Sequence, residues 1–373
     1  MPINKKSMLS LFQIFIISCF LLPLAVSAHS KACSFDAIYQ LGDSISDTGN
    51  LIREAPIGTS TAFARLPYGE TFFKKPTGRC SNGPLMVDFF ASALHLPFLN
   101  PYLARDADFS HGVNFAVAGS TALDTSSLAK NKIIPPVTNS SLSVQLGWFK
   151  DHLKSICYTS KCAHKLERAL FLVGEIGGND YNYAFFQGKT IGEIQSYVPY
   201  IVQKIKDVAR KVIDHGARTV VVPGNFPIGC MPIYLTAFRS DDPAAYDELK
   251  CLKGLNDLAM IHNDNLQRAL KQLRKEYPDV TIVYADYYTA LQWVLSHASS
   301  LGFEEKSLQK ACCGTGGDYN FDLTKMCGAP GVPVCPDPET RVSWDGIHLT
   351  EKAYKYMADF LMHSIMPEIQ CHI

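Results

Sequence analysis

The chain has 373 residues, of which 47% are hydrophobic and 19% are charged. This composition is sufficient for a packed core and excludes a disordered or low-complexity chain. Basic and acidic residues number 35 each, and no basic cluster is interleaved with aromatic residues. Charge therefore predicts no nucleic-acid partner, and length alone allows either one large domain or two ordinary ones.

The N-terminus has the layout of a signal peptide. Lysines at positions 5 and 6 precede an apolar run over residues 8–26, and small residues follow up to Ala28. We expect a signal peptide over 1–28 and a single mature domain over 29–373. A retained signal anchor is the alternative, because the run approaches the length of a short membrane span. No later stretch of that length is free of charge, so we expect no stable membrane span after signal removal.

Cysteine usage agrees with the secretory pathway. Eleven of the twelve cysteines lie beyond the signal, which predicts disulfides and at least one unpaired thiol. Cys157 and Cys162 could close a local loop. Four more cysteines crowd one segment rich in Gly and Pro, at positions 312, 313, 327 and 335. A zinc site is the competing interpretation, which the absence of paired C-x2-C spacing disfavours, so no metal is expected. Asn139 begins the sequon "NSS" and is the candidate glycosylation site.

Short apolar runs alternate with helical patterns along the rest of the chain. The runs that predict buried parallel strands are 35–42, 112–119, 169–178, 218–224 and 280–286. Helical periodicity covers 84–94, 142–156, 190–215, 255–277 and 350–364, and in the third of these Thr190 can cap the start and Gly216 the end. The alternation predicts an α/β fold whose parallel sheet is covered on both faces.

Two irregular segments interrupt this pattern, at 50–82 and 302–347, and long irregular stretches in a compact domain are often functional loops. Nothing divides the mature chain into separate domains.

Polar residues follow the predicted strands where ligands bind in parallel sheets. The first strand ends in "QLGDSISDTG", which places Ser44 in a turn but lacks the second glycine of the G-x-S-x-G elbow. Taken alone, Ser44 would more often be a turn or cap residue. Gly119 ends the second run, and Asn179 follows the third in "GGND".

A serine nucleophile needs a base, and the base needs a group that fixes its tautomer. The stretch "SWDGIHLTEKAY" places Asp345 three residues before His348, beside an irregular loop. We expect His348 to accept the proton of Ser44 and Asp345 to orient the imidazole. The backbone N–H groups of Ser44 and Gly119 and the side-chain amide of Asn179 are the candidate donors to an oxyanion.

The segments "GDSISDTGN", "GVNFAVAGSTAL", "GEIGGNDYNYAF" and "WDGIHLTEKAY" together resemble the four sequence blocks of the plant GDSL esterase/lipases, which are SGNH hydrolases. The resemblance extends from about Cys33 to Cys371. It implies Ser44 as nucleophile, Gly119 and Asn179 as oxyanion donors, and His348 and Asp345 as base and partner. It also implies a flavodoxin-like three-layer α/β/α domain, extracellular or vacuolar delivery, and ester hydrolysis without metal or cofactor.

Within the family, the phrases "YQLGDS", "NPYL", "HGVNFAVAG" and "YADYY" are most similar to the acetylajmalan esterase branch. This implies a small plant ester as the substrate, with an acetylated or methyl-esterified indole alkaloid as one candidate. Acyl transfer to an alcohol, action on longer-chain lipids and binding without turnover are the alternatives. Oligomeric state is left open.

Aromatic residues near the predicted rim could form a cleft for a ring-containing ester, and Asp180 could meet a protonated amine there. The aromatic residues in question are Phe72, Phe73, Trp148, Tyr181, Tyr183, Phe185 and Phe186. Ordinary core packing is the alternative for each of them.

Overall fold

A five-stranded parallel sheet forms the centre of the computed structural model, which describes residues 35–156 and 161–371. The strands are β1 (Ala37–Leu41), β2 (Gly112–Asn114), β3 (Ala169–Val173), β4 (Thr219–Pro223) and β5 (Thr281–Ala285). Their order, β2-β1-β3-β4-β5, is that of flavodoxin-like sheets. On β1, Tyr39 pairs with Val113 of β2 and with Phe171 of β3, and all three side chains are buried. The predicted α/β class is confirmed.

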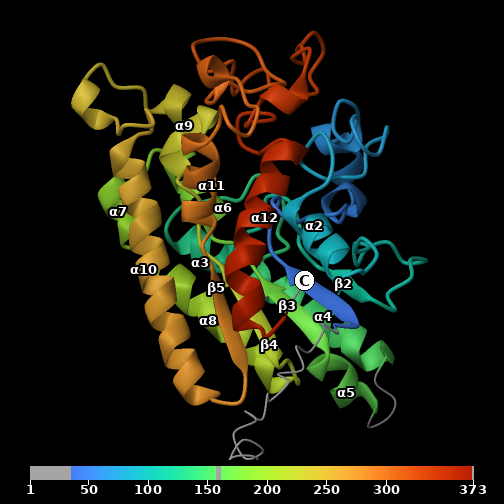
Figure 1. The fold of residues 1–373 in the computed structure, drawn as a ribbon. Helices are drawn as coiled ribbons and strands as arrows, with labels where there is room; N and C mark the ends of the chain where they lie inside the picture. The colour runs from blue at the N-terminus through green and yellow to red at the C-terminus, as the bar shows by residue number, and fades with distance from the viewer. Residues whose placement is uncertain (1–34, 157–160, 372–373) are drawn as a thin grey trace, which may run out of the picture.

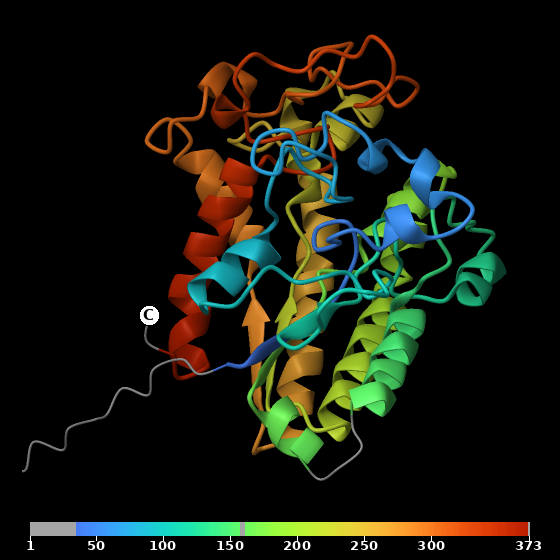
Figure 2. The ribbon, with the colours of Figure 1, turned by 90° about the vertical axis from the view of Figure 1, so that its right-hand side faces the viewer.

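Helices cover both faces of the sheet (Figures 1 and 2). They are α2 (Met86–Ala93), α3 (Thr125–Lys130), α4 (Leu142–Ile156), α5 (Lys161–Glu167), α6 (Gly178–Phe186), α7 (Ile191–Gln195), α8 (Val198–Asp214), α9 (Pro232–Ala237), α10 (Lys253–Glu276), α11 (Tyr287–Ser296) and α12 (Glu351–Glu368). Figure 2 shows α2 and α12 on one side of the sheet and α4 and α8 on the other. The three-layer arrangement leaves the carboxyl ends of the strands open to the loops above them.

The helix predicted over 190–215 is two helices. Thr190 caps α7 as expected, since its side chain accepts a hydrogen bond from the Glu193 N–H. The break before α8 coincides with Pro199, which has no N–H to donate and is favoured in the first turn of a helix. Gly216 follows α8 with φ +118°, a left-handed conformation that suits glycine. The two ends of the prediction were correct and its continuity was wrong.

The second strand is shorter than predicted, because only Gly112–Asn114 of the run 112–119 is β-structure. Near the end of the strand, two buried asparagines form side-chain hydrogen bonds with the backbone. The Asn50 amide donates to the carbonyl oxygens of Asn114 and Ala116, each at 2.8 Å. The Asn114 side chain accepts from the Ala116 N–H at 2.9 Å. The Phe115 and Val117 N–H groups still donate to the Gln40 and Gly42 carbonyls at 2.7 and 3.2 Å. The side-chain hydrogen bonds therefore supplement the backbone bonds to β1 as the chain turns towards Gly119.

Disulfides cross-link the irregular segment 302–347 and the part of the chain that follows β4. The described pairs are Cys230–Cys251, Cys312–Cys335 and Cys313–Cys327. Cys371 is also disulfide-bonded. Cys80 is buried and is not disulfide-bonded, which confirms the prediction of at least one unpaired thiol. The predicted signal peptide and the side chains of Cys157 and Cys162 lie outside the described residues.

The other irregular segment, 50–82, is anchored to α2 by a buried ion pair. Arg79 donates two hydrogen bonds to Asp88, at 2.7 and 2.8 Å, and the two side chains are 7% and 0% exposed. Asp88 also accepts from the Leu85 N–H at the start of α2. The guanidinium lies 4.6 Å from the ring centre of Phe73. These contacts compensate both charges where water is excluded.

Arg79→Ala is expected to lower the free energy of unfolding by about 3–5 kcal/mol, because it leaves the Asp88 carboxylate buried without its partner. Urea unfolding followed by circular dichroism measures this loss. Lys154→Ala is the matched control, since it breaks the exposed Lys154–Asp151 pair and should change little. Equal losses in the two variants would contradict the structural role of Arg79.

Candidate active site

Ser44 lies in the turn that follows β1 and is 8% exposed. Asp43 holds this turn: its side chain accepts from the Ile45 N–H at 3.1 Å, and its carbonyl oxygen accepts from the N–H groups of Ser46 and Asp47. Within the described residues, the Ser44 N–H has no acceptor in the protein. The turn thus presents a hydroxyl and a free donor at the same position.

The loop carrying Gly119 is tied to the Ser44 turn. The Val117 N–H donates to the Gly42 carbonyl at 3.2 Å, and the Ala118 N–H donates to Asp47 at 2.8 Å. Gly119 has φ +83°, and a Cβ there would lie 2.6 Å from the side chain of Val137. Glycine is therefore required both by the backbone conformation and by the close approach. The Gly119 N–H has no acceptor among residues 35–156 and 161–371.

Asn179 reaches the same place from the first turn of α6. Its side-chain amide donates to the Ser120 carbonyl at 2.9 Å and, more weakly, to the Asp43 carboxyl at 3.3 Å. The residues after β1, β2 and β3 are thus joined by hydrogen bonds, as expected for polar groups at neighbouring strand ends.

Asp345 and His348 form the second half of the site. His348 Nδ1 lies 2.7 Å from Asp345 Oδ2, and the N–H groups of Ile347 and His348 donate to Asp345 Oδ1 at 3.0 and 2.7 Å. Both side chains are buried. Burial acts to raise the pKa of Asp345, but the charge of His348 and these hydrogen bonds outweigh it, so the pKa lies below its ordinary value. The aspartate is held as a carboxylate.

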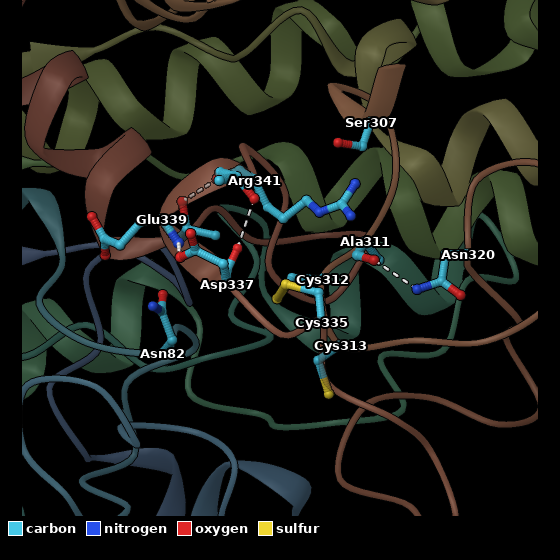
Figure 3. Close-up of a disulfide and its surroundings, with 12 residues drawn as sticks. Asn82, Ser307, Ala311, Cys312, Cys313, Asn320, Cys335, Asp337, Glu339 and Arg341 are labelled. Carbon is cyan, nitrogen blue, oxygen red and sulfur yellow. Dashed lines mark hydrogen bonds between the residues drawn. A yellow bond between two sulfur atoms is a disulfide. The ribbon is translucent and has the colours of Figure 1, made fainter. Parts of the chain in front are cut away.

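The disulfide-bonded segment holds the loop that carries Asp345. The Cys312 N–H donates to the Ser343 carbonyl at 3.0 Å, and the Cys313 N–H donates to the Trp344 carbonyl at 2.7 Å. Figure 3 shows the Cys312–Cys335 disulfide beside the hydrogen bond from Asn320 to the Ala311 carbonyl. The disulfide-bonded cysteines and the residues just before Asp345 are therefore joined by backbone hydrogen bonds.

The chain that follows His348 is bonded to the end of segment 50–82. The Ser81 hydroxyl donates to the Leu349 carbonyl at 2.9 Å, and the Glu351 N–H donates to Asn82 at 2.8 Å. No hydrogen bond joins Ser44 to His348 in the described part of the chain. Such contacts are often long in structures without substrate.

A buried pair of acids, which sequence reasoning missed, lies beneath the site. Glu175 follows β3, and its side chain is hydrogen-bonded to Asp43. Burial raises the pKa of Asp43 to about 7, against the opposing effects of the Ile45 N–H and of His348. Burial and then the charge of Asp43 raise the pKa of Glu175 well above its ordinary value. Glu175 accordingly keeps its proton and donates a hydrogen bond to Asp43.

Asp180 is a structural residue, so the expectation that it could meet a substrate amine was wrong. It is 1% exposed, and its two oxygens accept from the N–H groups of Ala122 and Leu123 at 2.8 and 3.0 Å. Two of the aromatic residues named as candidates for the cleft also have partners within the fold. Tyr183 donates to the Gly119 carbonyl at 2.7 Å, whereas Trp148 stacks on Tyr102.

Two further searches cover the described residues alone. In them, no group of three or more His, Cys, Asp and Glu side chains is arranged to hold a metal ion. No helix among them has the length and apolar character needed to cross a membrane.

The fold and the polar groups at its carboxyl-end rim define an α/β enzyme. The sequence matches the family described as GDSL-like lipase/acylhydrolase over residues 38–361, and the chain belongs to that family. It is 48% identical to acetylajmalan esterase of Rauvolfia serpentina over 352 residues, which span 94% of this chain and 91% of the relative. It is 47% identical to a GDSL esterase/lipase of Arabidopsis thaliana, over 94% of this chain and 96% of the relative. The chain is a carboxylic ester hydrolase.

Glu175→Gln should reduce the pH dependence of stability between about pH 4 and pH 7. A carboxyl whose pKa is raised by folding stabilises the fold fully below its unfolded pKa, and this contribution is lost as the pH rises through the folded value. The amide of the variant cannot ionise, and Asp43 no longer has an acidic neighbour. The stability lost as the pH rises should therefore be smaller than in the wild type. Urea unfolding at pH 4, 5.5 and 7 measures it. Glu248→Gln, at an exposed position, is the control. An unchanged pH dependence of stability in Glu175→Gln would contradict the raised pKa of Glu175.

Proposed function

We propose that the chain hydrolyses small carboxylic esters through an acyl intermediate on Ser44. The observation that carries this proposal is the 2.7 Å hydrogen bond between Asp345 Oδ2 and His348 Nδ1. With Nδ1 bonded to a carboxylate, Nε2 is the nitrogen left to take a proton from a serine hydroxyl.

In the first step His348 removes the proton of Ser44 as the serine oxygen attacks the ester carbonyl. The tetrahedral intermediate collapses, the protonated imidazole gives its proton to the leaving alcohol, and an acyl-serine is left. Water then attacks the acyl carbonyl with His348 again as base, and the imidazolium returns that proton to the Ser44 oxygen as the bond to the acyl group breaks and the carboxylic acid leaves. Asp345 stays ionised throughout and stabilises the imidazolium that forms twice.

The oxyanion of each step would be bound by the N–H groups of Ser44 and Gly119 and by the amide of Asn179. Both backbone donors are free of acceptors in the described chain, which supports their assignment. The Asn179 amide donates to the Ser120 carbonyl at 2.9 Å and to the Asp43 carboxyl at 3.3 Å, and we propose that the N–H of the longer bond turns to the substrate oxyanion. Removing one such donor typically lowers the rate by about 100- to 1,000-fold.

An acetylated or methyl-esterified indole alkaloid is the substrate we propose. The similarity to acetylajmalan esterase supports this class of ester. Apolar side chains beside the reacting groups support it further: Phe63 lies edge-on to His348 with ring centres 5.8 Å apart, and Val137 flanks Gly119.

We also propose that the protein is processed in the secretory pathway, for extracellular or vacuolar delivery, and that Asn139 carries a glycan. The disulfides support passage through an oxidising compartment. Asn139 is exposed, as an acceptor of a glycan must be. The mechanism uses no metal or cofactor.

Ser44→Ala should lower kcat for a short-chain nitrophenyl ester by at least about 1,000-fold, because no other group supplies the nucleophile. Ser46→Ala is the matched control, a buried serine two residues away in the same turn, and should retain the wild-type rate. Initial rates of the purified proteins measure both. Ester hydrolysis by Ser44→Ala at the wild-type rate would refute the mechanism.

The same wild-type protein distinguishes the substrate classes. We expect kcat/KM for acetyl or methyl esters of indole alkaloids to exceed that for long-chain acyl esters. Higher values on long-chain esters would favour a lipase, and transesterified product in the presence of added alcohols would favour an acyltransferase.

A further inference from the structure

The hydroxyl of Tyr68 lies against the carboxylate that orients His348. Tyr68 Oη donates to Asp345 Oδ2 at 2.8 Å, and the same oxygen bonds His348 Nδ1 at 2.7 Å. Tyr68 and Asp345 are each 1% exposed. The tyrosine belongs to the irregular segment 50–82 and is separated from Asp345 by 277 residues.

The direction of this hydrogen bond is fixed by the chemistry of the two groups. Burial, and then the negative charge and hydrogen bond of Asp345, raise the pKa of Tyr68 well above 10, so the phenol keeps its proton. Asp345 is ionised and accepts. Its Oδ1 is already occupied by two backbone N–H groups, so Tyr68 and His348 share Oδ2.

The ring of Tyr68 is held in place by aromatic neighbours. Phe63 and Trp344 lie edge-on to it, with ring centres 5.0 and 6.2 Å away, and Phe63 also contacts His348. The next residue, Gly69, donates its N–H to the Ser81 carbonyl at 2.9 Å. A buried ring enclosed in this way cannot turn its hydroxyl away from the carboxylate without moving the loop.

We propose that Tyr68 is a positioning residue, which holds the Asp345 carboxylate towards His348 and draws part of its negative charge away from the imidazole. This inference rests on the proposed function, because it assigns Tyr68 a role in setting the strength of the base. The hydroxyl touches no reacting atom. It acts through Asp345 alone.

Removal of the hydroxyl has a predictable sign. Without Tyr68 the carboxylate loses one donor, its charge falls more fully on His348, and the imidazolium becomes more stable. More of the enzyme is then protonated, and inactive as a base, at a given pH below neutrality. The acid limb of the pH–rate profile therefore moves to higher pH.

Three other titratable groups surround this network. Asp43 interacts electrostatically with His348, and Cys80 and Tyr354 interact electrostatically with Asp345. Burial, ahead of the nearby acids, raises the pKa of the Cys80 thiol well above its ordinary value, and burial also raises the pKa of Tyr354. Both groups stay neutral. None of the three is altered when the Tyr68 hydroxyl is removed, so a difference between profiles reports on Tyr68.

The test is the profile of kcat/KM for nitrophenyl acetate from pH 5 to 9 in full-length Tyr68→Phe. We expect the midpoint of the acid limb to move up by about one pH unit, because a hydrogen bond to a charged group changes an equilibrium by about tenfold or more. KM should change little. Tyr39→Phe is the matched control, because the Tyr39 hydroxyl is buried without a hydrogen-bond partner among the described residues and its ring stacks on Phe171 within the sheet.

A second replacement at position 68 keeps the packing of the ring and should shift the acid limb in the opposite direction. A fluorinated tyrosine at position 68 has a more acidic phenol and donates more strongly, so the acid limb should move to lower pH. Opposite shifts in the two proteins would confirm the proposal. A fall in kcat without any shift of the limb, or wild-type profiles in both, would overturn it.

Failure of the proposed function is recognised separately by Ser44→Ala in the same assay. If Ser44→Ala is inactive and the Tyr68 profiles match the wild type, the role of Tyr68 alone is refuted. If Ser44→Ala is active, the proposed mechanism is refuted, and the role of Tyr68 falls with it.

Discussion

The buried carboxylate of Asp345 is the constraint on which the site depends. A charge removed from water is costly unless hydrogen bonds and an opposite charge replace its solvation. Four donors meet this requirement: the Tyr68 hydroxyl, the N–H groups of Ile347 and His348, and the His348 ring. Two of these donors are backbone groups of the Asp345 loop, one is the ring of the proposed base, and one comes from a segment near the other end of the chain. Satisfying the charge therefore also assembles the site.

The two irregular segments make this assembly possible, since each is fixed to a rigid element. The segment 50–82 is held to α2 by the buried pair of Arg79 and Asp88. The segment 302–347 is closed on itself by two disulfides and is bonded to α9, where the Ile233 N–H donates to the Gly346 carbonyl at 3.0 Å. Loops on a rigid scaffold can carry precise chemistry when their backbones are tied down in this way. Both segments lie above the carboxyl ends of the strands (Figure 2).

Local sequence predicted those features that local physics determines. The spacing of Asp345 and His348 placed the two side chains together, and alternating apolar runs gave the parallel sheet. Pro199 was a readable signal for the break between α7 and α8, because proline has no N–H for a continuing helix. The shortening of β2 was not readable, since it depends on the distant Asn50 amide.

Contacts between distant segments account for what sequence reasoning missed at the site. Tyr68 has no motif that marks it as a partner of Asp345, and Glu175 meets Asp43 only because β1 and β3 are neighbours in the sheet. The burial that shifts the pKa of both acids is a property of the folded chain. Asp180 was misjudged for the same reason, because its two backbone donors follow β2.

The central claim, that Ser44 is the nucleophile, is tested most directly by covalent trapping. A fluorophosphonate forms a stable adduct with a serine activated by a general base, and peptide mass spectrometry locates it. The account predicts one adduct per chain, on the peptide that contains Ser44, formed quickly in the wild type and very slowly in His348→Ala. An adduct on another residue, or an active esterase that is not labelled at Ser44, would contradict the account.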